Sequence, residues 1–598
     1  MTVPPAGAFP CQTLVDLLRC RARHQPAEVA YVFLTDGELE AEEITYRQLD
    51  QQASRIGAWL QACEPEAEAV GLLFTPGLPF IAAFFGCLYA GVVAVPLPTP
   101  PGLKQLDGVA AILEDAGTSL VLTASSLLER LQNAASDCAG KQPIRWVATD
   151  QLGDRFYDHL ADQQDHSWRH PEVSGDSPAF YQYTSGTTQT PRGVVVSHAN
   201  VLANEEVIRQ AFQHDSQMIG MGWLPHYHDM GLIGNILQTL YIGRPCILMS
   251  PFHFIQRPFR WLKAISHYRA TSSGGPNFAY ALCARKVSRS QLDQLDLSCW
   301  SLAFTGAETV RWETMRSFAD KFSACGFNPS AFYPCYGLAE ATLFVTGSNN
   351  RGAIVVKNVS RQGLTENRVV LAEADGEQSA TLVGCGREWM GHQVLIVDPE
   401  HRTRCPADRV GEIWVQGPSV AKGYRNRRQD SEQTFAATLA DSRLGPFLRT
   451  GDLGFLHDHN LFITGRIKEI IILQGKTLYP QAIEWTVEQC SEGLQPGGGA
   501  AFSIDLDGGE QVVIVQEVER TALHAIISSQ CIEAIRTRVL AVHGVRLHAV
   551  VLTRPATIPR TSSGKIRRST CRQEFLERRL AVVHCWTLPG VGQVFPKD

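Results

Sequence analysis

Short apolar runs alternate with helix-like patterns along the first half of the chain. Leu14, Leu17 and Leu18 stand at helical spacing, an apolar run follows at Val29–Leu34, and a second helical pattern runs from Tyr46 to Trp59. The alternation continues through residues 109–113, 120–123 and 145–148. Strands that alternate with helices form mostly parallel sheets, so the pattern predicts an α/β fold.

Residues 70–97 are almost wholly apolar and long enough to suggest a membrane span. Pro76, Pro79 and several glycines divide this stretch into a strand at 70–74, a helix at 79–90 and a strand at 92–96. A strand–helix–strand unit of a parallel sheet is continuously hydrophobic because both faces of its strands are covered. We therefore expect no membrane span.

The pattern changes after the α/β region. Residues 347–380 are rich in polar residues and glycine, which indicates an inserted subdomain or a long connection. Short alternating runs predict a β-rich subdomain at about 385–465, and the few strands and segregated helices that follow predict a compact α+β module. We thus expect a large N-terminal domain (1–467) with mixed and parallel sheets, a small, mobile α+β C-terminal domain (468–580) and a tail (581–598).

Composition excludes several classes of protein. With 44% hydrophobic and 19% charged residues, the chain is globular, and 598 residues exceed one ordinary core. A net charge of −6 gives no support to nucleic-acid binding. The 16 cysteines form no C-x-x-C pair, and the first ten residues show no secretory signal pattern, so we expect a cytoplasmic protein with reduced thiols.

A hydroxyl-rich loop lies between two apolar runs, at 180–183 and 194–196. It reads Tyr183-Thr184-Ser185-Gly186-Thr187-Thr188-Gln189-Thr190-Pro191-Arg192-Gly193. Backbone amides and Ser/Thr hydroxyls both donate to phosphate oxygens, so the loop is suited to a polyphosphate. The same composition also suits an ordinary turn between two strands.

Other stretches offer complementary chemistry. Gly306-Ala307-Glu308 follows an apolar strand, where ligands bind in α/β folds. Tyr336-Gly337-Leu338-Ala339-Glu340 combines an aromatic face for a purine with a carboxylate for a cation. Asp452 suits ribose hydroxyls, and Lys565 lies on a flexible loop. Taken singly, Glu340 is equally a helix-start carboxylate, Asp452 a turn residue, and His226 and His228 structural histidines. Pro559 and Ile566 exclude a Walker A loop around Lys565.

Together and in this order, these motifs resemble the adenylate-forming superfamily of acyl-CoA synthetases, adenylation domains and luciferases, over roughly residues 12–575. Within it the sequence is most similar to the fatty acyl-AMP ligases. The stretches that carry this likeness are Leu224-Pro225-His226-Tyr227-His228-Asp229-Met230-Gly231-Leu232-Ile233, Ser273-Gly274-Gly275-Pro276-Asn277-Phe278-Ala279-Tyr280, Phe332-Tyr333-Pro334-Cys335-Tyr336-Gly337-Leu338-Ala339-Glu340-Ala341-Thr342 and Arg560-Thr561-Ser562-Ser563-Gly564-Lys565-Ile566-Arg567-Arg568.

The resemblance implies a two-step reaction. A fatty carboxylate attacks the α-phosphate of ATP, giving acyl-AMP and pyrophosphate, and the acyl group then passes to the phosphopantetheine thiol of a separate acyl carrier protein. It further implies that Lys565 bridges the carboxylate and the α-phosphate, and that Glu340 holds Mg²⁺ with the Thr184 hydroxyl. His228 would lie beside the acyl carboxylate, and Lys468 would be the hinge that lets Lys565 enter the site in one domain orientation.

The resemblance also implies which residues contact each part of the substrates. The nucleotide would contact Thr184, Ser185, Gly186, Thr187, Thr188, Gly306, Ala307, Glu308, Tyr336, Gly337, Asp452 and Arg466. The acyl chain would contact His228, Met230, Gly231, Ile233 and Phe278.

Two positions depart from the superfamily pattern. Gln189 replaces the usual glycine and Arg192 the usual lysine, although neither change removes a hydroxyl.

An acyl-CoA synthetase with CoA as acceptor, and a catalytically silent acyl-nucleotide-binding module, are the alternatives. The Arg-rich end, Arg567, Arg568, Arg572, Arg578 and Arg579, is interpreted as a solvated helix face or a docking patch for an acidic carrier.

Overall fold

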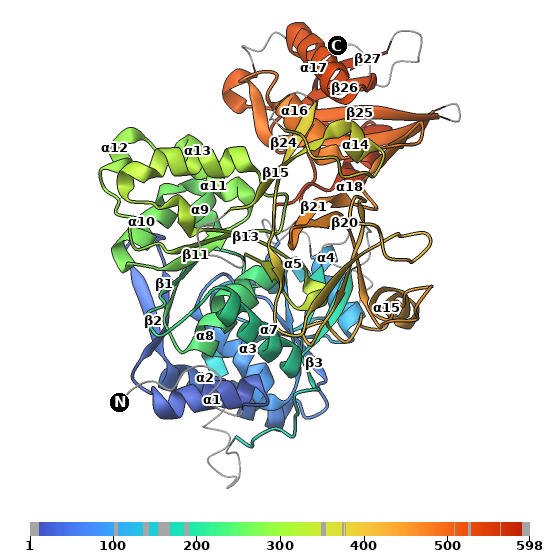
Figure 1. Cartoon of the computed structure of the whole chain (residues 1–598). Coiled ribbons are helices and arrows are strands. Elements are labelled where there is room, and N and C mark those ends of the chain that lie inside the picture. Colours follow the sequence, from blue (N-terminus) through green and yellow to red (C-terminus); the bar gives the residue numbers. More distant parts are fainter. Residues whose placement is uncertain are drawn as a thin grey trace.

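The computed structural model describes residues 11–100, 106–135, 143–152, 168–184, 191–348, 354–373, 376, 378–506, 509–523, 528–561 and 564–588. Figure 1 shows a large lower part that contains the main sheets, with a small domain, coloured orange to red, above it. The chain is therefore organised as a mixed α/β protein with a large and a small part, as its sequence predicts.

One main sheet has six strands in the order β6-β5-β3-β4-β7-β8. Pairing is parallel from β6 to β7, and β7 and β8 form an antiparallel hairpin at the edge. The strands are β3 (Ala69–Leu72), β4 (Val93–Pro96), β5 (Leu120–Thr123), β6 (Arg145–Ala148), β7 (Pro178–Thr184) and β8 (Arg192–Ser197). Helix α3 (Leu78–Ala90) connects β3 to β4 and is buried along nearly its whole length. The apolar stretch 70–97 is thus the strand–helix–strand unit that its prolines and glycines predict.

The other main sheet has nine strands in the order β17-β14-β13-β12-β11-β9-β10-β1-β2. Its strands are β1 (Val29–Leu34), β2 (Ala41–Thr45), β9 (Gly220–Gly222), β10 (Cys246–Met249), β11 (Ser272–Gly275), β12 (Leu302–Thr305), β13 (Phe332–Gly337), β14 (Phe344–Gly347) and β17 (Arg387–Glu388). Neighbours from β1 to β13 pair in parallel. The carboxyl ends of β11, β12 and β13 therefore meet at one edge, where ligands bind in such folds.

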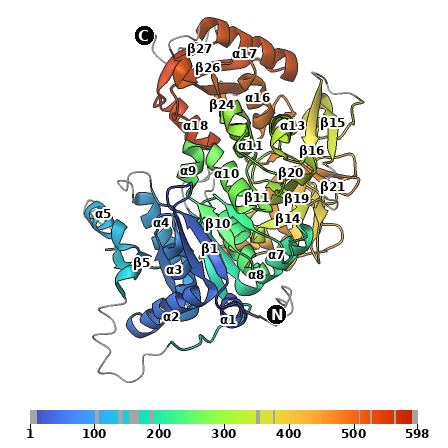
Figure 2. The same cartoon turned by 90° about the vertical axis from the view of Figure 1, so that its left-hand side faces the viewer.

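Helices fill the space between and around these sheets (Figure 2). They are α1 (Leu14–His24), α2 (Tyr46–Cys63), α4 (Asp107–Ala116), α5 (Ser125–Ala135), α7 (His198–Ala211), the π-helix η3 (Met230–Leu237), α8 (Gln238–Ile242), α9 (Pro251–Gln256), α10 (Phe259–Tyr268), α11 (Asn277–Lys286), α12 (Arg289–Leu292) and α13 (Trp312–Phe322). Short 3₁₀ turns are η2 (Thr149–Gln151), η4 (Ser323–Cys325), η5 (Pro329–Ala331), η6 (Ala339–Ala341) and η7 (Arg520–Ala522). Ser197 caps α7 through a capping box with Asn200. Within the described ranges, no helix has the length and apolar character that crossing a bilayer requires.

The β-rich subdomain is a four-stranded antiparallel sheet of β18 (Gln393–Val397), β19 (Gly411–Gln416), β20 (Leu448–His457) and β21 (Asn460–Arg466), with α15 (Arg428–Phe435) beside it. The polar stretch 347–380 contains β15 (Val356–Ser360) and α14 (Arg361–Thr365), and β15 pairs with β16 (Ser379–Val383). Val359 and Leu364 of this insertion share an apolar cluster with Phe455 of the β-rich subdomain and Tyr479 of the small domain. The insertion is therefore packed against both parts.

The small domain contains the hairpin β22 (Ile471–Leu473) and β23 (Lys476–Leu478), and a sheet of β24 (Leu494–Leu506), β25 (Gly509–Val518), β26 (Leu547–Thr553) and β27 (Val582–Thr587), with helices α16 (Pro480–Glu488), α17 (Ser528–His543) and α18 (Arg568–Leu576). One sequence expectation is wrong here. The stretch 581–598 is not simply a tail, because β27 pairs with β26 at the edge of the sheet. The run Gly497-Gly498-Gly499 lies within β24, where a register shift accommodates it.

Candidate active site

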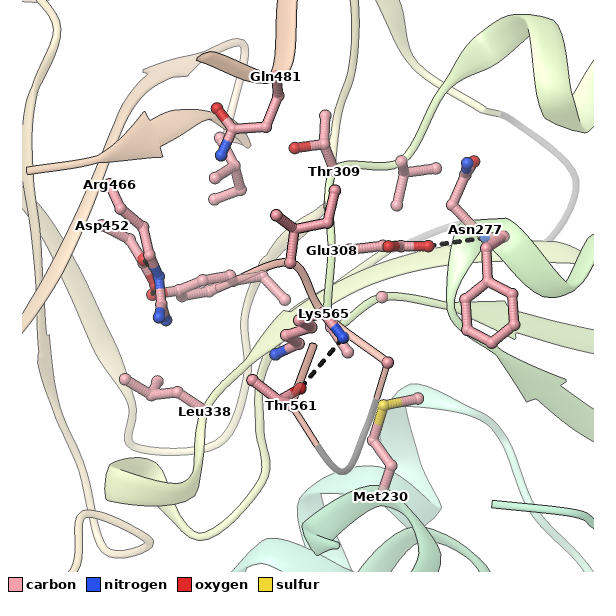
Figure 3. Close-up of a pocket in the computed structure, with 18 of the residues that line it drawn as sticks. Met230, Asn277, Glu308, Thr309, Leu338, Asp452, Arg466, Gln481, Thr561 and Lys565 are labelled. Carbon is pink, nitrogen blue, oxygen red and sulfur yellow. Dashed lines mark hydrogen bonds and ion pairs between the residues drawn. The ribbon is translucent and has the colours of Figure 1, made fainter. Parts of the chain in front are cut away.

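A cavity of about 1510 Å³ lies where the parallel strands, the β-rich subdomain and the small domain meet. Figure 3 shows side chains from all three parts pointing into it. Its lining includes most of the residues that the sequence singles out, namely Thr184, His228, Met230, Phe278, Gly306, Ala307, Glu308, Tyr336, Gly337, Glu340, Asp452, Arg466, Lys468 and Lys565.

Asp452 is itself buried and is the centre of a polar group on one wall. Its carboxylate accepts hydrogen bonds from the Tyr336 phenol, at 2.7 Å, and from Arg466 Nε, at 2.6 Å. Asp452 on β20 pairs directly with Arg466 on β21, so the sheet register brings them together. The Asp452 charge raises the pKa of Arg466, while burial and Asp452 raise the pKa of Tyr336 well above its ordinary value. The Asp452 carboxylate is therefore held in position by a hydrogen bond on each side.

The turn after β12 forms the adjoining wall. A Cβ on Gly306 would lie 2.8 Å from the carbonyl oxygen of Cys335, so β12 and β13 approach closely only because glycine is present. Ala307 follows with a positive φ of 66°. The backbone N–H of Phe278 donates to Glu308 Oε1 at 2.7 Å, and enclosure raises the pKa of this carboxyl. The turn thus presents backbone and a carboxylate to the cavity.

The hydroxyl-rich loop joins β7 to β8, as the sequence predicts, with Thr184 opposite Arg192 in the hairpin. Ser185, Gly186, Thr187, Thr188 and Gln189 lie outside the described residues. Residues 421–425 pair with β8, since Val195 N–H donates to Gly423 and Arg425 N–H donates to Gly193. The base of the loop is therefore held by a segment that also contacts Glu340, whose carbonyl accepts from Ala421 N–H.

Tyr424 connects this segment to the proposed metal ligand. Its phenol donates to Glu340 Oε1 at 2.9 Å, and the Arg192 guanidinium lies 5.5 Å from the centroid of its ring. Arg192 also lies 3.4 Å from Asp430. Sequence reasoning missed Tyr424, because a single tyrosine between glycine and arginine gives no signal by its spacing. The structure thus gives the unusual Arg192 a defined place, in contact with Tyr424.

Glu340 and Thr184 suit Mg²⁺ by their chemistry, since both present oxygen atoms and line the same cavity. Among the described residues, no cluster of three or more His, Cys, Asp or Glu side chains could hold a metal ion. An ion held here would therefore take its other ligands from phosphates and water, which is the usual way that Mg²⁺ is bound.

Lys565 enters the cavity from the small domain. Its backbone N–H donates to Thr561 Oγ1 at 3.1 Å, which fixes the loop around it. Figure 3 shows the side chain between the Asp452–Arg466 pair and Glu308. Enclosure lowers the pKa of Lys565, and the Arg466 charge lowers it further. The carboxylates that oppose this shift are those of Asp229, Asp452 and Glu308.

Arg572, Arg578 and Arg579 are exposed, as the interpretation of the Arg-rich end as a solvated face expects, but Arg568 is not. Its guanidinium lies 2.5 Å from Glu469 and 2.7 Å from Glu484, and its side chain is only 13% exposed. Glu469 is adjacent to Lys468, the predicted hinge residue. Arg568 therefore links the loop of Lys565 to the hinge region instead of facing solvent.

Only some of the residues that the sequence predicts to contact the acyl chain line the cavity. His228 Nδ1 lies 2.6 Å from Asp229 Oδ1. Although burial alone would raise the pKa of Asp229, His228 and Lys565 hold it below its ordinary value. Met230 and Phe278 line the cavity.

Gly231 and Ile233 do not line this cavity. Ile233 is fully buried in the core between the sheets, and a Cβ on Gly231 would lie 2.0 Å from the Pro225 carbonyl oxygen. Both residues lie in the π-helix η3, which presents Gly234 to the cavity instead. Residue spacing in the sequence does not predict a π-helix. It therefore assigns Ile233 to the cavity wall where the structure has Gly234. The apolar wall beside Gly234 is formed by Ile208, Phe212, Met230, Leu343 and Phe344.

Comparison with known proteins identifies the family of the chain. Residues 18–425 match the AMP-binding enzyme family. The chain belongs to that family. Residues 468–585 match the AMP domain of the Disco-interacting protein 2-like family, so the small domain has a counterpart of its own.

Relatives of known description place the chain among the fatty-acid-activating members of the AMP-binding family. It is 43% identical to JamA of Moorena producens, a medium-chain-fatty-acid acyl-carrier-protein ligase, over 95% of this chain and 96% of JamA. It is 35% identical to FadD26 of Mycobacterium bovis, a long-chain-fatty-acid AMP ligase, over 94% of this chain and 97% of FadD26. A fatty acyl-adenylate ligase from L. pneumophila, solved with acyl adenylate and pyrophosphate, is 39% identical with a TM-score of 0.74, covering 97% of this chain and 98% of that one. The resemblance to the fatty acyl-AMP ligases is confirmed.

Proposed function

We propose that this AMP-binding enzyme activates a fatty acid with ATP to acyl-AMP and pyrophosphate and then transfers the acyl group to the phosphopantetheine thiol of an acyl carrier protein. The observation that carries the proposal is the meeting of Lys565 with Asp452, Arg466 and Glu340 in one cavity. The names of JamA and FadD26 support a fatty acid as substrate, and that of JamA supports a carrier protein as acceptor.

In the first step, a carboxylate oxygen bonds to the α-phosphorus while the bond to pyrophosphate breaks. Both reactants are anions, so the site must neutralise charge that builds in the transition state. Lys565 supplies a cation between the two walls of the cavity. Its lowered pKa reflects the cost of enclosing that cation, which the incoming anions would relieve.

The other residues bind and orient the nucleotide. Asp452 accepts hydrogen bonds from the ribose hydroxyls while Arg466 and Tyr336 hold its carboxylate in place. Gly306, Ala307 and Gly337 present backbone to the adenine, and Thr184 with the adjoining Ser185–Thr188 binds the pyrophosphate. Glu340 and Thr184 would hold Mg²⁺, which would neutralise phosphate charge when bound.

The acyl chain occupies the apolar wall formed by Ile208, Phe212, Met230, Gly234 and Phe344. His228, held by Asp229, lines the same cavity and contacts the carboxylate. The length of chain accepted is set by how far this wall extends past Gly234.

In the second step, the thiol attacks the acyl carbonyl and AMP leaves. Lys468 acts as the hinge that rotates the small domain between the steps, which removes Lys565 from the cavity. We place this reaction in the cytoplasm, as the sequence leads us to expect.

The test is a panel of fatty acids of increasing length, incubated with ATP and Mg²⁺ and analysed for acyl-AMP, then chased with CoA or with a phosphopantetheinylated carrier protein. We expect acyl-AMP to form and thioester to appear much faster on the carrier. Equal transfer to CoA would make the protein an acyl-CoA synthetase. Nucleotide binding without acyl-AMP would make it a silent binding module.

A further inference from the structure

Arg311 is firmly fixed in the large domain. It precedes α13, and its backbone N–H donates to Asn277 Oδ1 at 3.0 Å. Asn277 Nδ2 in turn donates to Thr314 Oγ1 at 3.3 Å. The backbone of Arg311 is therefore held by α11 and α13 together, independently of the small domain.

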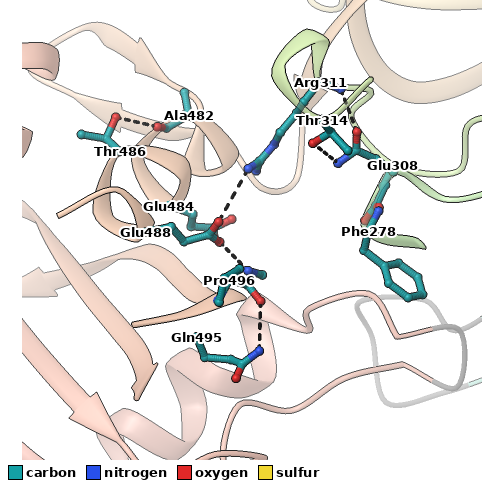
Figure 4. Close-up of polar contacts among 12 residues, drawn as sticks. Phe278, Glu308, Arg311, Thr314, Ala482, Glu484, Thr486, Glu488, Gln495 and Pro496 are labelled. Carbon is teal, nitrogen blue, oxygen red and sulfur yellow. Dashed lines mark hydrogen bonds and ion pairs between the residues drawn. The ribbon is translucent and has the colours of Figure 1, made fainter. Parts of the chain in front are cut away.

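The side chain of Arg311 crosses to the small domain (Figure 4). Its guanidinium lies 4.2 Å from the centroid of the Trp485 ring, and Nη1 lies 3.7 Å from Glu488 Oε2. Trp485 and Glu488 are three residues apart on α16, so they share one face of that helix. Arg311 thus makes a cation–π contact and an ion pair with adjacent turns of one helix.

Glu488 continues the contact toward the catalytic loop. Its Oε1 accepts from Gly497 N–H at 2.8 Å, and the Gly497 carbonyl accepts from Arg560 Nη2 at 2.6 Å. Arg560 Nη1 donates to the Gly564 carbonyl at 3.2 Å, directly before Lys565. A continuous set of polar contacts therefore joins Arg311 of the large domain to the loop that carries Lys565.

Burial distinguishes this ion pair from a surface contact. The Glu488 side chain is 5% exposed, and that of Arg311 is 22% exposed. Arg285 and Glu519 also form an ion pair across the domain boundary, at 3.6 Å, but they are 38% and 31% exposed. Exposed pairs contribute little, whereas removing one partner of a buried pair leaves a desolvated charge. Burial raises the pKa of Glu488 to about 7, with Arg311 opposing this shift, so the pair is fully ionised only above neutral pH.

From these contacts we propose that Arg311 is a positioning residue that clamps the small domain in the orientation in which Lys565 enters the cavity. The inference rests on the proposed two-step reaction. Acyl-AMP formation needs Lys565 in the cavity, so the clamp favours it. Transfer needs the small domain to rotate, so the contacts of Arg311 with Trp485 and Glu488 must break before the acyl group leaves.

The test separates the two half-reactions at pH 8, where Glu488 is ionised. For Arg311→Gln, we expect single-turnover formation of acyl-AMP to slow by about tenfold. Transfer to carrier protein from chemically synthesised acyl-AMP should be unchanged or faster. Arg285→Gln, which breaks the exposed pair, is the matched control and should alter neither step. A double variant, Arg311→Glu with Glu488→Arg, should regain part of the lost rate because it restores the ion pair in reverse.

The results that would contradict the clamp differ from the result that would contradict the proposed function. Equal slowing of both half-reactions in Arg311→Gln would overturn the clamp, as would no change in either. Thermal unfolding of each variant identifies a folding defect, and because such a defect lowers the amount of folded protein in both half-reactions, only a selective loss of acyl-AMP formation supports the clamp. If the unaltered protein forms no acyl-AMP, the proposed function itself fails.

Discussion

The Tyr424 phenol donates a 2.9 Å hydrogen bond to the Glu340 carboxylate, across 84 residues of sequence. This bond orients the proposed Mg²⁺ ligand. For Tyr424→Phe, we expect the rate of pyrophosphate release to fall by about fivefold, since such a bond contributes about 1 kcal/mol. The Mg²⁺ concentration required for half-maximal rate should rise.

The matched control for Tyr424 is Tyr241, whose phenol donates to Glu206 at 2.8 Å, and neither of these two residues lines the cavity. Tyr241→Phe loses a similar bond and should leave the Mg²⁺ dependence unchanged. If both variants change the Mg²⁺ dependence to the same extent, Tyr424 has a structural role only.

Lys565→Ala should slow acyl-AMP formation by at least about 100-fold while ATP still binds, because it removes the cation between the two reacting anions. Exchange of labelled pyrophosphate into ATP measures the chemical step, and equilibrium dialysis measures ATP binding. Lys476→Ala removes an exposed lysine of the same domain and should have no effect. An unchanged exchange rate in Lys565→Ala would remove this residue from the mechanism.

Leu364 should influence the choice of acceptor. It is 6% exposed and belongs to the apolar cluster that joins the insertion to Tyr479 of the small domain. Leu364→Ser should loosen this packing and raise thioester formation on CoA relative to carrier protein, because the small domain gains other orientations. Val370→Ser, at a 43% exposed position of the same insertion, is the control. If CoA use stays at its original level after Leu364→Ser, the insertion does not set the acceptor.

Gly234 should limit the length of the acyl chain. A Cβ at this position would lie 3.3 Å from Leu343 Cδ2, so a larger side chain must extend into the apolar part of the cavity. Gly234→Leu should shift the fatty-acid profile toward shorter chains. Ala281→Leu enlarges a residue on another wall of the cavity and should keep the original profile. The same profile for both variants would place the acyl chain elsewhere.

His226 should make the fold sensitive to acid. It is 6% exposed, its ring centroid lies 4.0 Å from that of Phe80, and neither imidazole nitrogen has a hydrogen-bond partner in the described part of the chain. Burial lowers its pKa to about 3. The unfolded chain therefore binds a proton below about pH 6.5 while the folded chain does not, so stability falls as pH decreases toward 3.

The cost at His226 is about 2 kcal/mol between pH 6.5 and pH 5. His226→Leu removes this titration, so its melting temperature should fall less than that of the original protein over this range. If the melting temperatures of the two proteins fall by the same amount over this pH range, the imidazole of His226 is not buried in its neutral form.

The local sequence determined most of the elements and much of the site. The prolines and glycines of 70–97 divide an apolar stretch into strand, helix and strand, and Ser197 begins α7 through its own side chain. Apolar alternation and capping act over a few residues, which is why they can be read without a structure. The order of the motifs around Gly306, Glu340, Asp452 and Lys565 likewise sufficed to predict that they serve one reaction.

Contacts between distant segments decided the rest. Tyr424 reaches Glu340 only because residues 421–425 pair with β8, and Arg311 meets Glu488 only because two domains pack in one orientation. The π-helix turns Gly234 instead of Ile233 toward the cavity, and β27 is a strand only because β26 offers it an edge. Such pairings depend on which surfaces fold against each other, and their free energy is absent from any short stretch of sequence.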